Sequence, residues 1–154
     1  VTDDGLAYLS GLKNLEHLTI NHSVKGPGLI HLKDLKSLTF LSVRFIAFTD
    51  DDLAHLSNLT NLQTLRFQDS EVTDDGLRNL SKLQKLEHLN LGARNLTDAA
   101  LPHLYPLKSL KFVDIISLDV TDDGLAQLRK QRPDVSYFAI PDRHYNSTDA
   151  QTTK

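Results

Sequence analysis

The chain has 154 residues, of which 40% are hydrophobic, and a formal net charge of −3 at pH 7. This apolar content suffices for one continuous hydrophobic core, and no apolar run approaches the roughly 20 residues that a membrane-spanning helix needs. The sequence holds no cysteine, which excludes disulfides and leaves the redox compartment open.

A sequence repeat fills most of the chain. The pentapeptide T-D-D-G-L occurs three times, at residues 2–6, 73–77 and 121–125. The hydrophobic residue that precedes this position recurs at intervals of 23, 24, 24, 24 and 24 residues, at Val1, Val24, Phe48, Val72, Leu96 and Val120. A fixed period of this length predicts a solenoid, in which each unit buries its apolar face only by stacking on its neighbours.

Each unit begins with a short predicted helix. The pattern G-L-x-x-L-x-x-L occupies Gly5–Leu12 in the first unit and Gly76–Leu83 in the fourth, and apolar residues three apart mark one face of a helix. The Thr and Asp residues just before it suit the N-cap and first turn, because they satisfy free backbone N–H groups and favour the helix dipole. In the second unit K-G-P-G at 25–28 predicts a looser helix start, and Pro102 and Pro106 predict a short or irregular fifth helix.

Each unit ends with a predicted strand. Its pattern is L-x-x-L-x-L, and the closing alternation is typical of a strand with one buried face. The apolar positions are Leu15, Leu18, Ile20; Leu38, Leu41, Val43; Leu62, Leu65, Phe67; Leu86, Leu89, Leu91; Leu110, Val113, Ile115; and, one residue late, Val135, Phe138, Ile140. Strands that run in one direction predict a parallel sheet with helices on its other side. Since helices are about 10 Å wide and strands lie about 4.8 Å apart, we expect the stack to curve with the sheet inside.

The two half-patterns, L-x-x-L-x-L and T-D-x-G-L-x-x-L, together resemble a leucine-rich repeat protein over about residues 1–140. The nearest types are the 24-residue repeats of bacteria such as planctomycetes and the related cysteine-containing class. The resemblance implies an α/β horseshoe arc of about six strand–helix units, with the parallel sheet on the concave face and short helices on the convex face. One departure concerns the positions at which many such repeats carry Asn or Cys, which here hold Ser23, Ile46, Ser70, Arg94 and Leu118.

The repeat also sets the domain boundaries. We assign residues 1–141 to the solenoid and residues 142–154 to a polar, mobile C-terminal tail without periodicity. Because the chain has no methionine and starts in the middle of the repeat phase, we expect it to be part of a larger protein. The sequence contains no targeting segment, so its localisation stays unknown.

The exposed positions of successive strands should line up in rows across the sheet, about 4.8 Å apart. The buried positions are nearly all Leu, Ile, Val or Phe, so packing does not dictate the varied residues of these rows. The candidate partner-binding residues on the concave face are His17, Phe40, Arg44, Arg66, His88, Phe112, Asp114 and Tyr137. Exposed aromatic and arginine side chains are enriched at protein interfaces. The alternative is that the aromatic rings only cover the sheet and stack on one another.

These observations predict a non-catalytic module that binds a protein or peptide partner on its concave sheet, and the resemblance implies the same. Two other functions stay open: an architectural spacer within a longer repeat protein, and a carbohydrate or small-ligand receptor that uses the aromatic row. The unpaired edge of the first strand, Leu15–Ile20, also predicts an end-to-end homodimer through the exposed N-terminal repeat.

Other chemistries find no support in the sequence. Ten of the 20 carboxylates lie in the T-D-D-G turns, where helix capping accounts for them without Ca²⁺. The histidines form no zinc-binding set, and no nucleophile or phosphate-binding motif occurs, so we expect no enzyme activity, metal or cofactor. The negative net charge argues against nucleic-acid binding, and we expect no membrane insertion.

Overall fold

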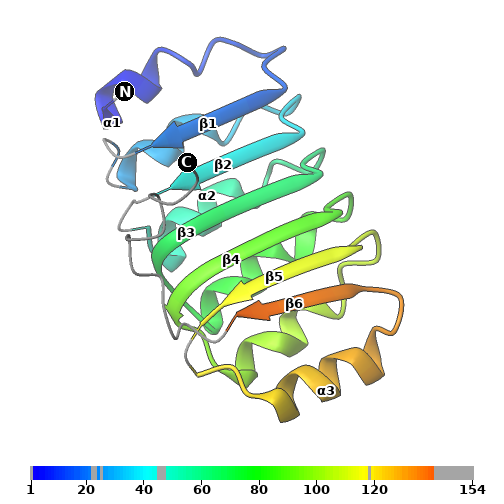
Figure 1. The fold of residues 1–154 in the computed structure, drawn as a ribbon. Helices are drawn as coiled ribbons and strands as arrows, with labels where there is room; N and C mark the ends of the chain where they lie inside the picture. The colour runs from blue at the N-terminus through cyan, green and yellow to red at the C-terminus, as the bar shows by residue number, and fades with distance from the viewer. Residues whose placement is uncertain (1, 22–23, 25, 45–47, 118, 141–154) are drawn as a thin grey trace, which may run out of the picture.

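The computed structural model describes residues 2–21, 24, 26–44, 48–117 and 119–140. Within these residues, six strands form one parallel sheet in chain order. The strands are β1 (His17–Asn21), β2 (Phe40–Arg44), β3 (Thr64–Thr73), β4 (His88–Asn95), β5 (Phe112–Ile116) and β6 (Ser136–Ile140). Figure 1 shows them side by side, from blue β1 to orange β6, with the helices along one face of the sheet. This arrangement confirms the predicted α/β solenoid arc.

A helix precedes each strand and covers the convex side. The α-helices are α1 (Asp3–Ala7), α2 (Asp50–Leu56) and α3 (Asp122–Gln131), and the 3₁₀ helices are η1 (Pro27–Leu32), η2 (Asp75–Lys82) and η3 (Asp98–Leu104). Two irregular helices lie where the sequence predicts them: η1 follows Gly26 at φ 93°, and η3 contains Pro102. None of the helices among the described residues has the length and apolar character needed to cross a lipid bilayer.

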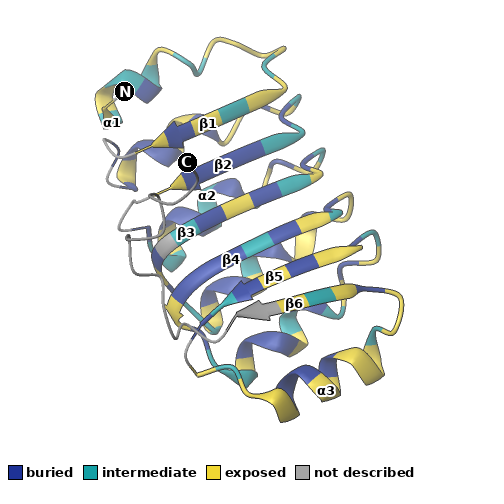
Figure 2. Cartoon of the chain, viewed as in Figure 1, coloured by how far each residue is buried: buried dark blue, intermediate teal, exposed yellow. Residues whose placement is uncertain are grey.

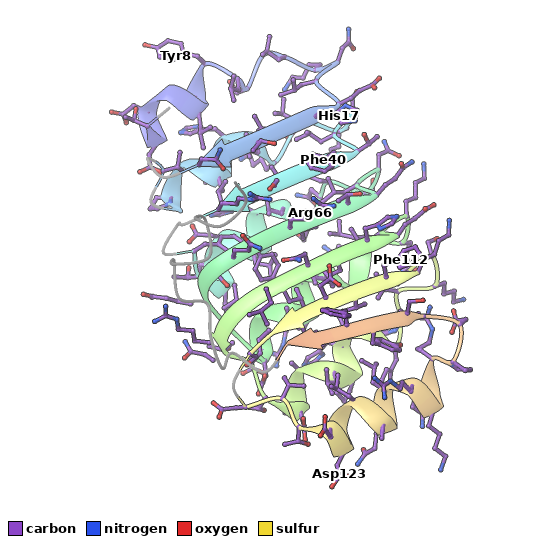
Figure 3. The ribbon with its side chains drawn as sticks, viewed as in Figure 1. Tyr8, His17, Phe40, Arg66, Phe112 and Asp123 are labelled. Carbon is purple, nitrogen blue, oxygen red and sulfur yellow. The ribbon has the colours of Figure 1, made fainter. Side chains whose placement is uncertain are left out.

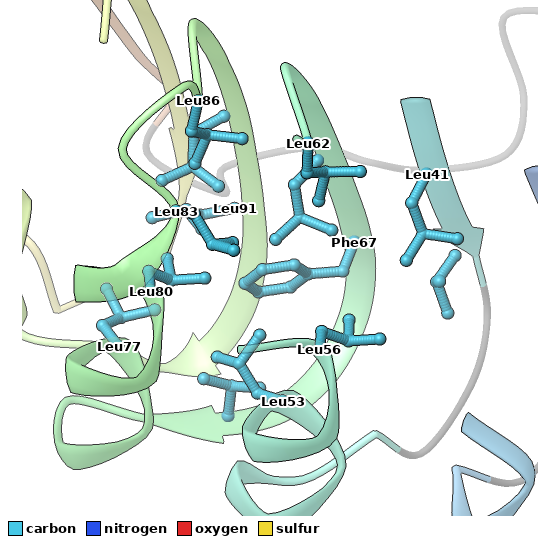
Figure 4. Packing of buried hydrophobic residues seen from close by; sticks show 14 of the residues in the cluster. Leu41, Leu53, Leu56, Leu62, Phe67, Leu77, Leu80, Leu83, Leu86 and Leu91 are labelled. Atoms are coloured by element: carbon cyan, nitrogen blue, oxygen red, sulfur yellow. The ribbon is translucent and has the colours of Figure 1, made fainter. Parts of the chain in front are cut away.

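The hydrophobic core fills the space between the sheet and the helices. One continuous cluster runs from Leu6 near the N-terminus to Val135 before β6. Figure 2 shows the buried positions as dark bands that recur along the strands and helices. At the centre the rings of Phe48 and Phe67 meet edge to face, with centroids 5.3 Å apart, and Figure 4 shows Phe67 among leucines of both layers. Neighbouring units therefore share their core side chains, as the solenoid pattern predicts.

The strand register agrees with the 24-residue period. His17, Phe40, Thr64, His88 and Phe112 are successive partners across β1 to β5. The prediction for the last strand is wrong, because Val113 pairs with Tyr137 and Asp114 pairs with Phe138. The regular spacing thus continues into β6 without the predicted shift of one residue. Tyr137 packs against the core, and Phe138 lies on the concave face.

Arg132 and Tyr137 fix this register. The Arg132 guanidinium donates hydrogen bonds to the carbonyl oxygens of Leu107 (2.9 Å) and Leu110 (3.2 Å) in the preceding unit. It also pairs with Asp134, which raises the pKa of Arg132 and lowers that of Asp134. The Tyr137 hydroxyl donates to the carbonyl oxygen of Arg132 at 3.1 Å. This bond holds the tyrosine on the inner side of β6.

The T-D-D-G turns join neighbouring units. The carboxylate of Asp50 accepts hydrogen bonds from the backbone N–H (2.9 Å) and the hydroxyl (2.7 Å) of Thr73 in the next unit. The other pairs with both bonds are Asp74 with Thr97 and Asp98 with Thr121. For these three aspartates, capping of their own helix is therefore an incomplete account, because each carboxylate bonds to the following unit.

One junction uses a different acceptor. The second unit has Gly26 where the other units carry this aspartate, so it offers no carboxylate to the third unit. Thr49 instead donates its N–H (3.0 Å) and its hydroxyl (2.9 Å) to Asp52 of its own helix. A Cβ atom at Gly26 would collide with that Asp52 carboxylate. Asp52 of the third unit thus supplies the carboxylate that Gly26 of the second unit lacks.

Candidate functional site

The candidate site is the concave face of the sheet, which carries the strand side chains that alternate with the buried ones. Its described members form the register rows His17, Phe40, Thr64, His88, Phe112, Ser136; Thr19, Ser42, Arg66, Asn90, Asp114, Phe138; and Asn21, Arg44, Gln68, Gly92, Ile116. Figure 3 shows His17, Phe40, Arg66 and Phe112 along this face, away from the helices.

Three of the predicted residues form a cluster over β1 to β3. The His17 ring stacks on the Phe40 ring with centroids 5.9 Å apart and an interplanar angle of 28°. The guanidinium carbon of Arg66 lies 5.7 Å from the centroid of the same phenyl ring. His17 and Arg66 are exposed, and Phe40 is half-buried between them. We call this group the first aromatic cluster.

A second aromatic cluster lies over β4 to β6. The His88 and Phe112 rings stack at 4.8 Å with an interplanar angle of 14°. Phe112 stays 48% exposed, and Phe138 on the neighbouring strand is 63% exposed. Next to these rings, the Asn90 side-chain amide donates a hydrogen bond to Asp114 at 3.3 Å. Among the described residues of the concave face, this cluster therefore has the most exposed large apolar side chains.

The two arginines of the concave face form no ion pair with any residue that the structure describes. Within the described part of the chain, ion pairs join Asp75 to Arg78, Glu87 to Lys111 and Asp134 to Arg132, and none involves Arg44 or Arg66. The hydrogen bond from Lys111 lowers the pKa of Glu87 at the rim of the sheet. Arg44 and Arg66 are both exposed, so the described part of the concave face presents two arginines whose charge no described side chain pairs with.

The structure corrects one predicted site residue and adds another. Tyr137 is not on the concave face, because its side chain turns to the core and burial raises its pKa to about 12. Phe138 occupies that face instead and was assigned to the core from the sequence. Extending the 24-residue spacing unchanged from β5 would have identified it. The other seven predicted residues all lie on the concave strands.

Polar atoms of the middle row complete the site. Ser42 is only 3% exposed, and among the described residues its hydroxyl and the Asn90 side-chain oxygen are buried without hydrogen-bond partners. No group of three or more His, Asp or Glu side chains in the described ranges could hold a metal ion. The face thus offers rings, arginines and amide groups, which are the chemistry of non-covalent recognition.

Comparison with known proteins yields structural relatives only. No family model matches the chain, and no curated protein matches it either. Internalin C2 of Listeria monocytogenes is similar to 87% of the chain, with a TM-score of 0.57 and 22% sequence identity. Another internalin of that species, inlF, matches 86% of the chain at a TM-score of 0.63 and 17% identity. A leucine-rich repeat protein of Leptospira interrogans matches 84% at a TM-score of 0.51 and 19% identity.

The extent of these matches limits what they establish. The chain spans 55%, 43% and 38% of the lengths of the three solved chains, and all identities lie below 25%. They therefore establish the architecture, and the activities of the longer proteins do not transfer with it. With its parallel sheet, helical outer layer and 24-residue register, this chain has the fold of a leucine-rich repeat solenoid.

Proposed function

We propose that the protein is a non-catalytic module that binds a protein or peptide partner on the concave face of its sheet. The observation that carries the proposal is the pair of aromatic clusters on a face that none of the described helices covers. Phe112 and Phe138 expose 48% and 63% of their surface there, although core packing does not require aromatic residues at these positions. Accessible apolar patches with aromatic and arginine side chains are typical of interaction sites.

The two other functions fit this face less well. A spacer segment needs no exposed rings, and polar side chains would keep its sheet soluble without them. A sugar receptor needs open ring faces for stacking, and in the first aromatic cluster His17 and Arg66 both lie against Phe40, so that ring is less accessible to a sugar. Protein binding uses such mixed aromatic and cationic surfaces directly, since rings supply buried area and arginine supplies hydrogen bonds.

Affinity capture from cells that express the parent protein tests the proposal. The wild-type chain is compared with a Phe40→Ala/Phe112→Ala/Phe138→Ala variant, and bound proteins are quantified by mass spectrometry. We expect the specific partners of the wild type to fall by about tenfold or more, because alanine at an interface hot spot removes about 2 kcal/mol each.

The matched control removes three exposed apolar side chains elsewhere. Tyr8, Leu12 and Ile30 lie outside the concave face and are 87%, 49% and 38% exposed. A Tyr8→Ala/Leu12→Ala/Ile30→Ala variant should retain the partners of the wild type, apart from any second copy of the chain that associates through the N-terminal repeat. Circular dichroism establishes that both variants are folded. Undiminished capture by the folded concave-face variant would contradict the proposal.

We also propose end-to-end association through the N-terminal repeat. β1 hydrogen-bonds to β2 alone among the described strands, so its other edge is free to pair with a second strand. Exposed Tyr8 and Leu12 precede β1 in the chain, and Leu12 is among the residues Gly11–Leu15 that line a shallow hollow of about 410 Å³. Sedimentation velocity should reveal dimers that a Tyr8→Lys/Leu12→Lys variant loses. A monomer at every accessible concentration would exclude this association.

A further inference from the structure

We infer that the concave face recognises an acidic, extended segment of a partner protein that carries two apolar side chains about four residues apart. The inference rests on the proposed function and specifies the chemistry of the partner. It follows from the sign of the charge on this face, from the way Arg66 is held, and from the distance between the two aromatic clusters.

The charge of the described register rows on the concave face is opposite in sign to that of the whole chain. The sequence has 20 acidic residues against 17 Lys and Arg, yet the charged members of the described register rows are Arg44, Arg66 and Asp114. Asp114 lies two strands from Arg66 and accepts a hydrogen bond from the Asn90 amide, whereas neither arginine is ion-paired with a described residue. Glu71 and Arg94 lie farther along β3 and β4, past the register shifts. A carboxylate is therefore the complementary group for the middle of this face.

Arg66 is positioned before any partner arrives. Its guanidinium lies 5.7 Å from the centre of the Phe40 ring, which in turn stacks on His17. A side chain that is already held loses less conformational entropy on binding. The planar guanidinium can then donate two parallel hydrogen bonds to one carboxylate. An Asp or Glu side chain of the partner matches this geometry.

The two aromatic clusters set the length of the segment. Phe40 on β2 and Phe112 on β5 are three strand spacings apart, which corresponds to about 14 Å across the sheet. An extended peptide advances about 3.3 Å per residue, so about four residues separate side chains that reach both rings. Arg66 lies on β3, between them. The acidic residue of the segment therefore falls between its two apolar anchors.

Single-stranded nucleic acid is an alternative ligand, because it is a polyanion whose bases stack on aromatic rings. Its affinity comes from several phosphates, each matched by a cation along a basic groove. The described rows of the concave face offer two arginines and one carboxylate on a chain with a net charge of −3. This balance favours a peptide with one or two acidic side chains over a polyphosphate backbone.

Selection from a phage-displayed library of random peptides tests the inference. The library is selected in parallel on the folded wild-type chain and on an Arg44→Glu/Arg66→Glu variant at low salt. The wild type should enrich peptides with Asp or Glu between two apolar residues. The variant should lose these sequences and enrich Lys or Arg at the same position, because its face then carries the opposite charge.

Binding of a synthesised wild-type-selected peptide gives the magnitude. We expect the charge-reversed variant to bind it about tenfold or more weakly, and the wild-type affinity to fall as salt is added. The matched control is Arg129→Glu/Lys130→Glu, which makes the same change of charge on exposed residues of α3. At about 0.15 M salt, where the Debye length is about 8 Å, its affinity should stay within about twofold of the wild type, because α3 lies in the helical layer on the other side of the sheet.

The outcomes separate the partner chemistry from the proposed function. Enriched peptides without acidic residues, or a composition that charge reversal leaves unchanged, would overturn the inference. So would tighter binding of a polyuridine oligonucleotide than of the selected peptide. If such non-acidic peptides still require Phe40 and Phe112, binding at the concave face stands with a different partner. Peptides that bind a Phe40→Ala/Phe112→Ala variant undiminished, or no enrichment over the bare support, would count against both proposals.

Discussion

At the scale of single residues, the turn aspartates link one repeat to the next. Each of these carboxylates satisfies two donors at once, a backbone N–H and a threonine hydroxyl, as Asp50 does for Thr73. Both partners are half-buried, so water would replace the carboxylate incompletely. The repeated Thr-Asp pair is thus a set of inter-unit connections as well as a helix start.

The variant Asp50→Ala tests this role. We expect it to lower the free energy of unfolding by about 2 kcal/mol, because it leaves two donors of Thr73 without their charged acceptor. Chemical denaturation followed by circular dichroism measures the change. The control is Asp51→Ala, since Asp51 is exposed in the same first helical turn and forms no hydrogen bond or ion pair with another described residue. Equal losses in the two variants would show that charge at the helix start matters and the connection does not.

The sequence did not reveal this connection, although it contains every residue involved. An Asp at the start of a helix fits capping equally well, and only the stacking of units brings its carboxylate to the next threonine. The sequence equally did not reveal that Asp52 is the acceptor for Thr49 at the junction where the preceding unit carries Gly26. A pattern along the chain predicts which face a residue occupies, but a hydrogen bond between units depends on their distance in space.

At the scale of the elements, the strands were predictable where their two faces differ. In β2 to β5 the core-facing positions are aliphatic or phenylalanine and the alternating positions are mostly polar, so the register followed from the period. β6 and the residue before it have apolar side chains on both faces, with Val135 and Tyr137 in one alternation and Phe138 in the other. A shift of one residue exchanges the faces of a strand. The hydrogen bonds of Arg132 to the preceding unit select one of the two registers of β6. Such long-range bonds cannot be predicted from the alternation of apolar and polar residues.

The burial of Tyr137 gives β6 a measurable dependence on pH. Desolvation raises the pKa of this phenol from 10.0 to about 12 in the folded protein. A pKa raised on folding means that the neutral phenol stabilises the fold fully below the unfolded value, and that this contribution is lost as the pH rises from about 10 to about 12. Tyr137→Phe should therefore flatten the decline in the free energy of unfolding over this range.

Denaturation curves at successive alkaline pH values measure this slope. At neutral pH the same variant should be less stable by about 1 kcal/mol, because the hydrogen bond to the Arg132 carbonyl is lost. Tyr8→Phe provides the control, since Tyr8 is 87% exposed. If both variants keep the wild-type alkaline slope, Tyr137 is not buried in the way described.

At the scale of the whole molecule, stability is distributed along a line of neighbours. Each strand pairs only with the strands before and after it among the described residues. Core side chains are fully buried at the centre, where Phe67 is 0% exposed. At and just before β1 the core is less well covered, because Leu15 and Leu18 are only partly buried. In such a solenoid the end units open first, and the central units set the global stability.

Hydrogen exchange on two core variants tests this distribution. Phe67→Ala should cost about 3–5 kcal/mol and raise exchange in every strand, because it leaves a cavity that the Phe48 ring and the surrounding leucines share. Leu18→Ala should cost about 1 kcal/mol and raise exchange in α1 and β1 alone, because a partly buried side chain at the end of the stack has one neighbouring unit. Faster exchange in β5 after Leu18→Ala would mean that the repeats unfold as one cooperative block. The two aromatic clusters of the concave face would then open together and not independently.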